Sequence, residues 1–298
     1  MTITRVSPDE LDRALDLIAG EQADISRGTT MLGEERDGVA AELADLSPDW
    51  GTTVRVARSG DDFLGASLLE HDEETGRGWV FGPWVVGGDE AWARWARPLL
   101  DAALDQLPGG IDRVELGGDV TNLRMAALAA EVGWEVSELS HVFAAKREAA
   151  RSWPPVAASI RRATAADREE IRPLHDAEFP ATYAPVERLL PDEPDEKFHV
   201  LVAEDPDQPG RFLGYAAGRV QPDGAGYLDY LAVSGAARGR GTGRDLVVAI
   251  STWLLETAPQ HDVNLTVQDR RTPARRLYES LGFTLELSMV SYSRPKSR

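Results

Sequence analysis

Apolar and polar positions alternate over short segments, in the same order, in two successive halves of the chain. Each half opens with a short alternating segment that predicts a strand. A hydroxyl side chain then precedes a carboxylate by three residues, which is the signature of a capping box at a helix start. The two openings are Ile3–Val6 with Ser7 and Glu10, and Ile160–Ala163 with Thr164 and Asp167. Both halves are therefore predicted to begin with a strand and a helix.

The remaining elements also correspond between the halves. Both second strands contain Phe-Leu-Gly, and both last helices end in glycine followed by an aromatic residue, where glycine supplies the left-handed residue that stops a helix. The offset is 149 residues for both motifs, Phe63-Leu64-Gly65 with Phe212-Leu213-Gly214 and Gly133-Trp134 with Gly282-Phe283. The predicted strands are Thr53–Arg58, Phe63–Leu69, Gly78–Val86 and Arg113–Gly117, and then Phe198–Glu204, Phe212–Arg219, Gly226–Val233 and Asp262–Val267. A constant offset between unrelated local elements indicates an internal duplication.

This order of elements predicts an α/β (α+β) fold in each half, with a mixed, mostly antiparallel sheet flanked by helices on both faces. The halves are separated by a segment with a Pro154-Pro155 pair and no regular period, which is typical of a stiff connection. We therefore expect one domain over residues 1–146, a linker over 147–158, and a second domain over 159–298.

The composition narrows the class of protein. Hydrophobic residues make up 42% and charged residues 28% of the 298, as in a soluble globular protein. No apolar run approaches the roughly 20 residues that span a bilayer, and the N-terminus has no signal-peptide pattern. The absence of cysteine excludes disulfides, thiolate metal ligands and a cysteine nucleophile. We expect a cytoplasmic protein that does not bind a membrane.

The net charge of −18 lies mostly in the first half, where 29 acidic residues face 13 basic ones, whereas the second half has 21 and 19. Such a chain repels nucleic-acid phosphates and attracts cations. The charge fits an amine substrate, and it fits equally well a need for solubility or a high-GC or salt-adapted source. The five histidines show no paired spacing, so no metal site is expected.

A glycine-rich segment that follows the predicted strand Gly226–Val233 is the most informative part of the sequence. Its glycines let backbone N–H groups converge at the start of the next helix, where unpaired donors and the helix dipole bind phosphate oxygens. The segment consists of Arg238, Gly239, Arg240, Gly241, Thr242, Gly243 and Arg244. It lacks the Gly-Lys-Ser/Thr ending of a nucleoside-triphosphate loop, and its spacing and late position disfavour a dinucleotide loop. The alternative to a phosphate-binding loop is a flexible loop that binds no ligand.

The pattern Arg238-x-x-Gly241-x-Gly243 resembles the acyl-CoA loop of the GNAT superfamily of N-acyltransferases. A second motif, Leu277-Tyr-Glu-Ser-Leu-Gly-Phe283, is similar to the Leu-Tyr-x-x-x-Gly-Phe helix end of that family, at the expected distance from the loop. The resemblance is specific for residues 156–298. For residues 1–146 it rests on the internal duplication.

The resemblance implies roles for several residues. The backbone of Leu231, Ala232 and Val233 is expected to pair with the pantetheine arm of acetyl-CoA, and the amides from Arg238 to Arg244 to hold its pyrophosphate. Tyr278 matches the tyrosine that commonly protonates the departing thiolate, a role open to a phenol because it stays protonated at neutral pH. The family often has asparagine where this chain has Arg271, which puts that contact in doubt but leaves an arginine that can bind a CoA phosphate.

A general base is required because an alkylamine with a pKa of about 10 is mostly ammonium at pH 7. In this family the base often lies on the strand that leads into Leu-Ala-Val. Counting back by two from Val233 places Leu231, Asp229 and Tyr227 on one face, so Asp229 is the candidate, with a substrate-binding carboxylate as the alternative. Glu178 and Tyr183 lie where the family forms its acceptor pocket and are candidates for binding a cationic amine. The alternative is that this segment is an ordinary solvent-exposed helix end.

The first half lacks the corresponding cofactor motifs. Asp89 and Glu90 stand where a phosphate would approach, and Ala129 stands in place of the tyrosine. Asn122 is retained where the second half has Arg271. We expect this half to bind no cofactor and to have no catalytic role.

The sequence thus favours an acetyl-CoA-dependent N-acetyltransferase that acts on a primary amine of a small molecule by direct attack in a ternary complex. Two alternatives are a non-catalytic acyl-CoA sensor and a tandem transferase of the mycothiol-synthase kind. Neither a metal nor a nucleic acid is expected. The chain is expected to be a monomer or a homodimer, and the sequence does not identify the acceptor.

Overall fold

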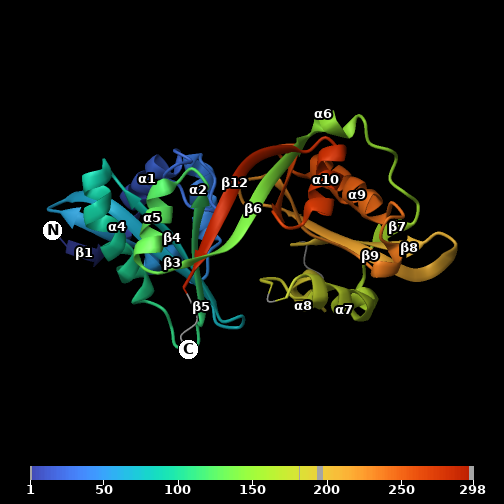
Figure 1. Cartoon of the computed structure of the whole chain (residues 1–298), viewed down its shortest axis with the longest axis horizontal. Coiled ribbons are helices and arrows are strands. Elements are labelled where there is room, and N and C mark those ends of the chain that lie inside the picture. Colours follow the sequence, from blue (N-terminus) through green and yellow to red (C-terminus); the bar gives the residue numbers. More distant parts are fainter. Residues whose placement is uncertain (1, 181, 193–196, 295–298) are drawn as a thin grey trace. The chain divides into compact units, whose positions relative to one another are not determined.

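The computed structural model describes residues 2–180, 182–192 and 197–294, and the chain divides into two compact units. The first unit consists of Met1–Ser140 together with Leu287–Arg298, and the second of His141–Glu286. Each unit contains a run of neighbouring strands that is covered by helices on both faces (Figure 1). The predicted fold class is confirmed.

The sheet of the first unit has the order β1-β2-β3-β4-β5-β12. The strands β1 to β5 pair antiparallel with their neighbours except for β4 and β5, which are parallel. The strands are β1 (Thr2–Arg5), β2 (Arg55–Ser59), β3 (Asp62–Asp72), β4 (Arg77–Val85), β5 (Arg113–Asp119) and β12 (Thr284–Ser293). The helices are η1 (Pro8–Glu10), α1 (Leu11–Gln22), α2 (Arg36–Ala44), α3 (Trp50–Thr53), α4 (Asp89–Leu104) and α5 (Leu123–Glu131).

Two hydrophobic cores cover the two faces of this sheet. Helices α1 and α2 pack with Phe81 and Trp84 on one face, and both aromatic side chains are buried. Helices α4 and α5 pack with Val114 and Leu116 on the other face. In β4, the adjacent Val80 and Phe81 pack in different cores, as expected for a sheet covered on both sides.

The sheet of the second unit has the order β6-β11-β10-β9-β8-β7, in which β10 and β11 are parallel and β7 to β10 are antiparallel. The strands are β6 (Glu135–Lys146), of which residues 141–146 belong to this unit, β7 (Ile160–Arg162), β8 (His199–Asp205), β9 (Gln208–Val220), β10 (Gly226–Val233) and β11 (Asp262–Gln268). The helices are α6 (Arg147–Ala150), η2 (Ala165–Asp167), α7 (Arg168–Glu178), α8 (Val186–Leu189), η3 (Gly235–Ala237), α9 (Thr242–Thr257) and α10 (Thr272–Ser280).

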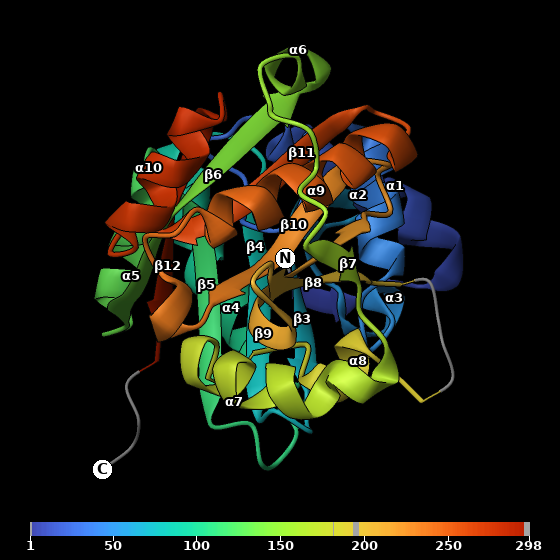
Figure 2. The same cartoon turned by 90° about the vertical axis from the view of Figure 1, so that its right-hand side faces the viewer.

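Helices α9 and α10 lie on one face of this second sheet, and α7 and α8 lie on the other (Figures 1 and 2). Leu228 packs on the α9 side, whereas Tyr230 and Ala232 pack on the α7 side. The partly buried Leu231 and Val233 pack on the α9 side.

Both predicted capping boxes are present, at Ser7 with Glu10 and at Thr164 with Asp167. The glycines predicted to end the last helix of each half, Gly133 and Gly282, have φ of 72° and 82°. This left-handed conformation is the one that glycine adopts without steric cost.

The compact units do not follow the predicted domain boundaries. The segment 147–158, expected to be an irregular linker, lies inside the second unit and begins with helix α6. Residues 287–293 of β12 belong to the first unit because this part of the strand pairs with β5, from Met289 opposite Asp119 to Ser293 opposite Glu115. Strand pairing of this kind leaves no local sign in the sequence, whereas a proline pair does.

Candidate active site

Strands β10 and β11 separate at the predicted site. Their parallel ladder runs from Gly226 opposite Val263 to Leu228 opposite Leu265, yet β10 continues to Val233 and β11 to Gln268. Beyond Leu228, the described part of β10 pairs with β9 alone. The backbone of residues 231–233 therefore borders an opening in the sheet, as the predicted pairing with a pantetheine arm requires.

The glycine-rich loop leads from this opening to α9. Gly239 and Gly241 have φ of 76° and 91°, and Gly241 is the N-cap of α9. Among the described residues, no side chain caps this helix, and a Cβ placed on either glycine would meet no atom within 4 Å. The first N–H groups of α9 lack acceptors within the helix. The loop thus presents uncapped donors at the positive end of a 16-residue helix, which is a suitable site for phosphate.

Arginines surround the loop and are partly held by acidic side chains. Arg238 donates to the carboxylate of Glu178 over 2.5 Å, and Arg240 lies 3.8 Å from the buried Asp205. Arg271 donates to the same Glu178 carboxylate over 3.2 Å and to its main-chain oxygen over 2.6 Å. Glu178 therefore joins two arginines that were predicted to bind CoA. Its predicted contact with an amine stays a prediction.

Tyr278 of α10 is 5% exposed and packs 5.8 Å from the ring of Phe283. Burial raises the pKa of this phenol, and the nearby Arg271 opposes the shift. The hydroxyl therefore stays protonated at neutral pH and can donate a hydrogen bond to the negative charge that develops on a departing thiolate.

Asp229 lies at a β-bulge, because Leu228 pairs with Gly218 and Tyr230 with Ala217. The prediction that Asp229 and Leu231 share one face of the strand is wrong because of this bulge. Asp229 bonds Tyr183 on the α7 face, whereas Leu231 packs on the α9 face. A count by two along a strand is invalid across an inserted residue.

The Asp229 side chain is fully buried and has three notable features. Its Oδ1 accepts a hydrogen bond from the Tyr183 hydroxyl and lies 3.4 Å from Nε of Arg219. Its Oδ2 is buried without a hydrogen-bond partner among the described residues. Burial raises the pKa of this carboxyl to about 6, against the opposing effects of Arg219 and Tyr183. A carboxylate with this pKa and one unpaired oxygen is much better suited to accept a proton than an exposed aspartate.

The segment after α7 is fixed by three consecutive residues. The Thr182 hydroxyl lies 2.6 Å from that of Tyr230, Tyr183 bonds Asp229, and the Ala184 carbonyl lies 3.0 Å from Nε2 of His175. His175 is fully buried, and burial lowers the pKa of its imidazole. Neutral His175 donates from Nε2, so its Nδ1 accepts from the hydroxyl of Tyr215.

Sequence reasoning missed Arg219, His175, Tyr215 and Tyr230 as parts of this arrangement. Arg219 is opposite Tyr227 in the β9–β10 ladder, and its guanidinium lies 5.7 Å from the Tyr183 ring centroid. The alternation along β9 was a usable signal for Arg219, since it places a charge on the covered face of a sheet. The histidine and tyrosines gave no such signal, because aromatic residues are common in cores.

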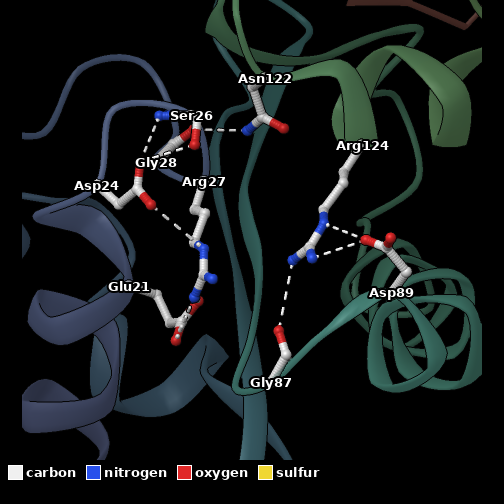
Figure 3. A network of polar contacts seen from close by, with 9 residues as sticks. All are labelled: Glu21, Asp24, Ser26, Arg27, Gly28, Gly87, Asp89, Asn122 and Arg124. Atoms are coloured by element: carbon white, nitrogen blue, oxygen red, sulfur yellow. Dashed lines mark hydrogen bonds and ion pairs between the residues drawn. The ribbon is translucent and has the colours of Figure 1, made fainter.

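The equivalent place in the first unit is built differently. Only residues 86–88 connect β4 to α4, against residues 234–241 in the second unit. Arg124 of α5 donates two hydrogen bonds to Oδ1 of Asp89, over 2.7 and 3.0 Å, and one to the carbonyl of Gly87 (Figure 3). An ion pair therefore lies at the start of α4, where a phosphate would have to bind.

Asn122 has a structural task in the first unit. Its Oδ1 accepts from the amide of Met125 and caps α5. Its Nδ2 donates to the carbonyl of Gly28 (Figure 3). The neighbouring Thr29 hydroxyl and Thr30 amide both donate to the carbonyl of Gly117, each over 2.9 Å. The α1–α2 segment is thus bonded to the end of β5, across the place where β4 and β5 separate.

Residues 168–283 match the family described as "Acetyltransferase (GNAT) family". These residues have the sequence pattern of a GNAT acetyltransferase domain, and the chain has the fold of solved GNAT structures.

Solved structures with this fold include a tandem protein. A GCN5-related N-acetyltransferase from Sphaerobacter thermophilus is 18% identical, with a TM-score of 0.69 over 99% of this chain and 96% of that one. A tandem GNAT protein from the clavulanic acid biosynthesis pathway is 17% identical, with a TM-score of 0.64 over 99% of both chains. These likenesses show the fold of the whole chain.

A curated relative is the mycothiol acetyltransferase of Thermomonospora curvata, which is 38% identical over 86 residues. The matched segment spans 29% of this chain and 29% of that protein. Within the residues that the structure describes, every helix is too short or too polar to cross a membrane.

Proposed function

We propose that this chain is an acetyl-CoA-dependent N-acetyltransferase that acetylates a primary amine of a small molecule. The observation that carries the proposal is the uncapped start of α9 behind the left-handed Gly239 and Gly241. This loop leads directly from the strand that contains the buried Asp229. Acetyl-CoA supplies the thioester from which the acetyl group is transferred.

Four groups of residues bind the co-substrate in this proposal. The amides of residues 238–244 hold the pyrophosphate, and the backbone of residues 231–233 pairs with the pantetheine arm. Arg240 and Arg244 lie within the loop and add cationic donors. Arg238 and Arg271 contribute after they exchange part of their contact with Glu178 for phosphate oxygens.

Asp229 is the proposed general base, acting directly or through one water molecule. Its unpaired Oδ2 takes a proton from the ammonium form of the amine, which frees the nitrogen lone pair for attack on the thioester carbon. Tyr183 donates to the other carboxylate oxygen and fixes its orientation, and we propose that it also lines the acceptor pocket.

Tyr278 is the proposed general acid. As the carbon–sulfur bond breaks, the electron pair moves to sulfur, and Tyr278 gives its proton to that atom. The nitrogen loses its second proton as the amide forms, and transfer of that proton to the Tyr278 phenolate restores the phenol. Asp229 returns its proton to solvent, so the net reaction releases one proton. The close placement of amine and thioester supplies much of the remaining acceleration.

The first unit is proposed to bind no CoA and to take no part in the chemistry. Its short β4–α4 connection and the Arg124–Asp89 pair support this assignment. The whole chain should therefore bind one molecule of CoA, and we propose that it acts as a monomer or a homodimer.

The test is a thiol-release assay with acetyl-CoA against a panel of primary amines, combined with calorimetry for CoA stoichiometry. Turnover of at least one amine and one CoA per chain are expected. CoA binding without turnover of any amine would instead indicate an acyl-CoA sensor. Because of the match to a mycothiol acetyltransferase, the acceptor of mycothiol synthesis belongs in the panel as a second candidate.

A further inference from the structure

The first unit contains a pocket of about 200 Å³ that the proposed chemistry does not use. It lies along the parallel ladder of β4 and β5, where Arg77 is opposite Arg113 and Trp79 is opposite Glu115. Residues 29–31 form its wall on the side of the α1–α2 segment, and Glu138 and Ser291 complete the lining.

The wall of this pocket is held in place by buried hydrogen bonds. Gln22 is 4% exposed, and its side-chain amide bonds both the N–H and the carbonyl of Thr29, over 2.9 and 3.0 Å. It also donates to the carbonyl of Leu32 over 3.1 Å and accepts from the indole of Trp84 over 3.0 Å. The segment that borders the pocket is therefore fixed on both sides of Met31, and the pocket exists before any ligand binds.

Met31 lies in this fixed segment in an unusual conformation. Its φ is 72°, in the left-handed region that a residue with a long apolar side chain rarely adopts, and the residue is 58% exposed. Backbone strain of this kind is retained where surrounding contacts impose it, frequently at ligand clamps. Here the imposed conformation leaves an apolar side chain exposed at the pocket.

Charged groups of both signs line the pocket. Glu115 is 9% exposed and receives hydrogen bonds from Arg77 over 2.8 Å and from Arg113 over 2.7 Å. Burial opposes its ionisation, yet the bonds from both arginines lower the pKa of its carboxyl. The Arg113 side chain is 42% exposed. It has five N–H donors, so its bond to Glu115 leaves donors for a ligand.

A second carboxylate, that of Glu138, also lines the pocket and accepts a hydrogen bond from the Ser140 hydroxyl over 2.9 Å. A carboxylate offers about four acceptor sites, so it can take a further donor such as an ammonium group. Trp79, under the guanidinium of Arg77 at 4.8 Å, and Phe81 supply apolar surface between the charged groups.

We infer that this pocket binds a small amino acid, with the ligand carboxylate on Arg113 and its amino group on Glu138. The volume excludes CoA and admits a molecule of a few heavy atoms. A planar guanidinium matches a carboxylate in two-pronged geometry. The inference does not depend on acetyl transfer, because every lining residue belongs to the first unit.

The experiment is calorimetry and thermal shift on the full chain without CoA, using a set of small L-amino acids. Propionate and ethylamine serve as analogues of alanine that lack one of the two charged groups. We expect saturable binding of at least one amino acid and binding of both analogues at least about tenfold weaker. Arg113→Gln should weaken binding about tenfold, and Arg97→Gln, a similarly exposed arginine on α4, should leave it unchanged.

Met31→Gly provides a second variant that should fold, because glycine accepts the left-handed backbone without strain. We expect it to weaken binding without lowering the melting temperature. Tyr278→Phe should bind the ligand as well as the unaltered chain does, which separates this site from the proposed transfer reaction. Absence of saturable binding at millimolar amino acid, or unchanged affinity in Arg113→Gln, would overturn the inference.

Discussion

The Tyr183 hydroxyl donates a hydrogen bond to Oδ1 of Asp229, and the other oxygen of that carboxylate is buried without a partner among the described residues. The two side chains come from the segment after α7 and from a bulge in β10. This contact joins the part of the chain expected to receive the amine to the residue expected to deprotonate it.

Tyr183→Phe tests this relationship. The hydrogen bond stabilises the ionised form of Asp229, so its loss should raise the carboxyl pKa above about 6. A general base works in its ionised form; therefore, kcat/KM should fall as the pH drops through the pKa, and the variant should show this fall at a higher pH. Thr182→Val, which removes the adjacent bond to Tyr230, is the control. It should leave the pH at which kcat/KM falls (the acid limb of the pH–rate profile) unchanged.

Asp229→Asn should lower turnover by on the order of 10²-fold or more, because it removes the proton acceptor. The acid limb of the rate profile should vanish with it. Retention of the limb in this variant would show that another group titrates there. Acetyl-CoA affinity, measured by calorimetry, should change little, since Asp229 lies outside the glycine loop.

Tyr278→Phe should lower kcat by roughly 10²-fold and leave acetyl-CoA binding nearly unchanged, because a general acid acts only as the thiolate leaves. Stopped-flow thiol release and calorimetry measure the two effects. Tyr227→Phe is the matched control: its hydroxyl bonds Thr266 and has no assigned role in proton transfer. Equal losses in both variants would remove Tyr278 from the mechanism.

The glycine loop offers a matched pair of substitutions. Gly241→Ala forces a Cβ onto a residue with φ of 91° and should weaken CoA binding by distorting the helix start. Gly243 has no positive φ, and its added Cβ would meet Val233 and Leu277 at ordinary distances of 3.5 and 3.7 Å. Gly243→Ala should therefore bind CoA nearly as well as the unaltered chain, whereas equal losses would contradict a conformational role for Gly241.

Glu70 predicts a pH-dependent stability in the first unit. Burial raises the pKa of its carboxyl to about 7, against a hydrogen bond from the Ser47 backbone. The folded chain therefore binds this proton more tightly than the unfolded chain, and its contribution to stability falls as the pH rises from about 4.5 to 7. At pH 8, Glu70→Gln should raise the free energy of unfolding, measured by urea titration, by at most about 3 kcal/mol relative to the unaltered chain. This gain should disappear at pH 4. The exposed Glu73→Gln should show no such gain.

Local patterns predicted local structure well. The strand Gly226–Val233 has the predicted bounds, and α9 begins at Thr242, directly after the glycine that the motif placed at its start. Both capping boxes formed because their atoms lie within one turn of each other. These features depend on neighbouring residues, so the sequence contains the information directly.

Features that depend on distant partners were not predicted. The bulge at Asp229 arises from the register between β9 and β10, so alternation along β10 alone placed the side chain with the wrong neighbours. The contacts of Glu178 with Arg238 and Arg271 join residues 60 and 93 positions apart in the chain. A pattern search identified these side chains but had no means of finding that they neutralise one another.

The placement of β12 has a consequence for how the gene can be divided. A fragment that stops at residue 146 retains β5 but not the strand segment from Met289 to Ser293 that pairs with it. Its partner fragment, residues 147–298, retains that segment and lacks β5. Cutting the coding sequence at the start of the predicted linker therefore yields a first fragment with an unsatisfied sheet edge, and such edges favour aggregation.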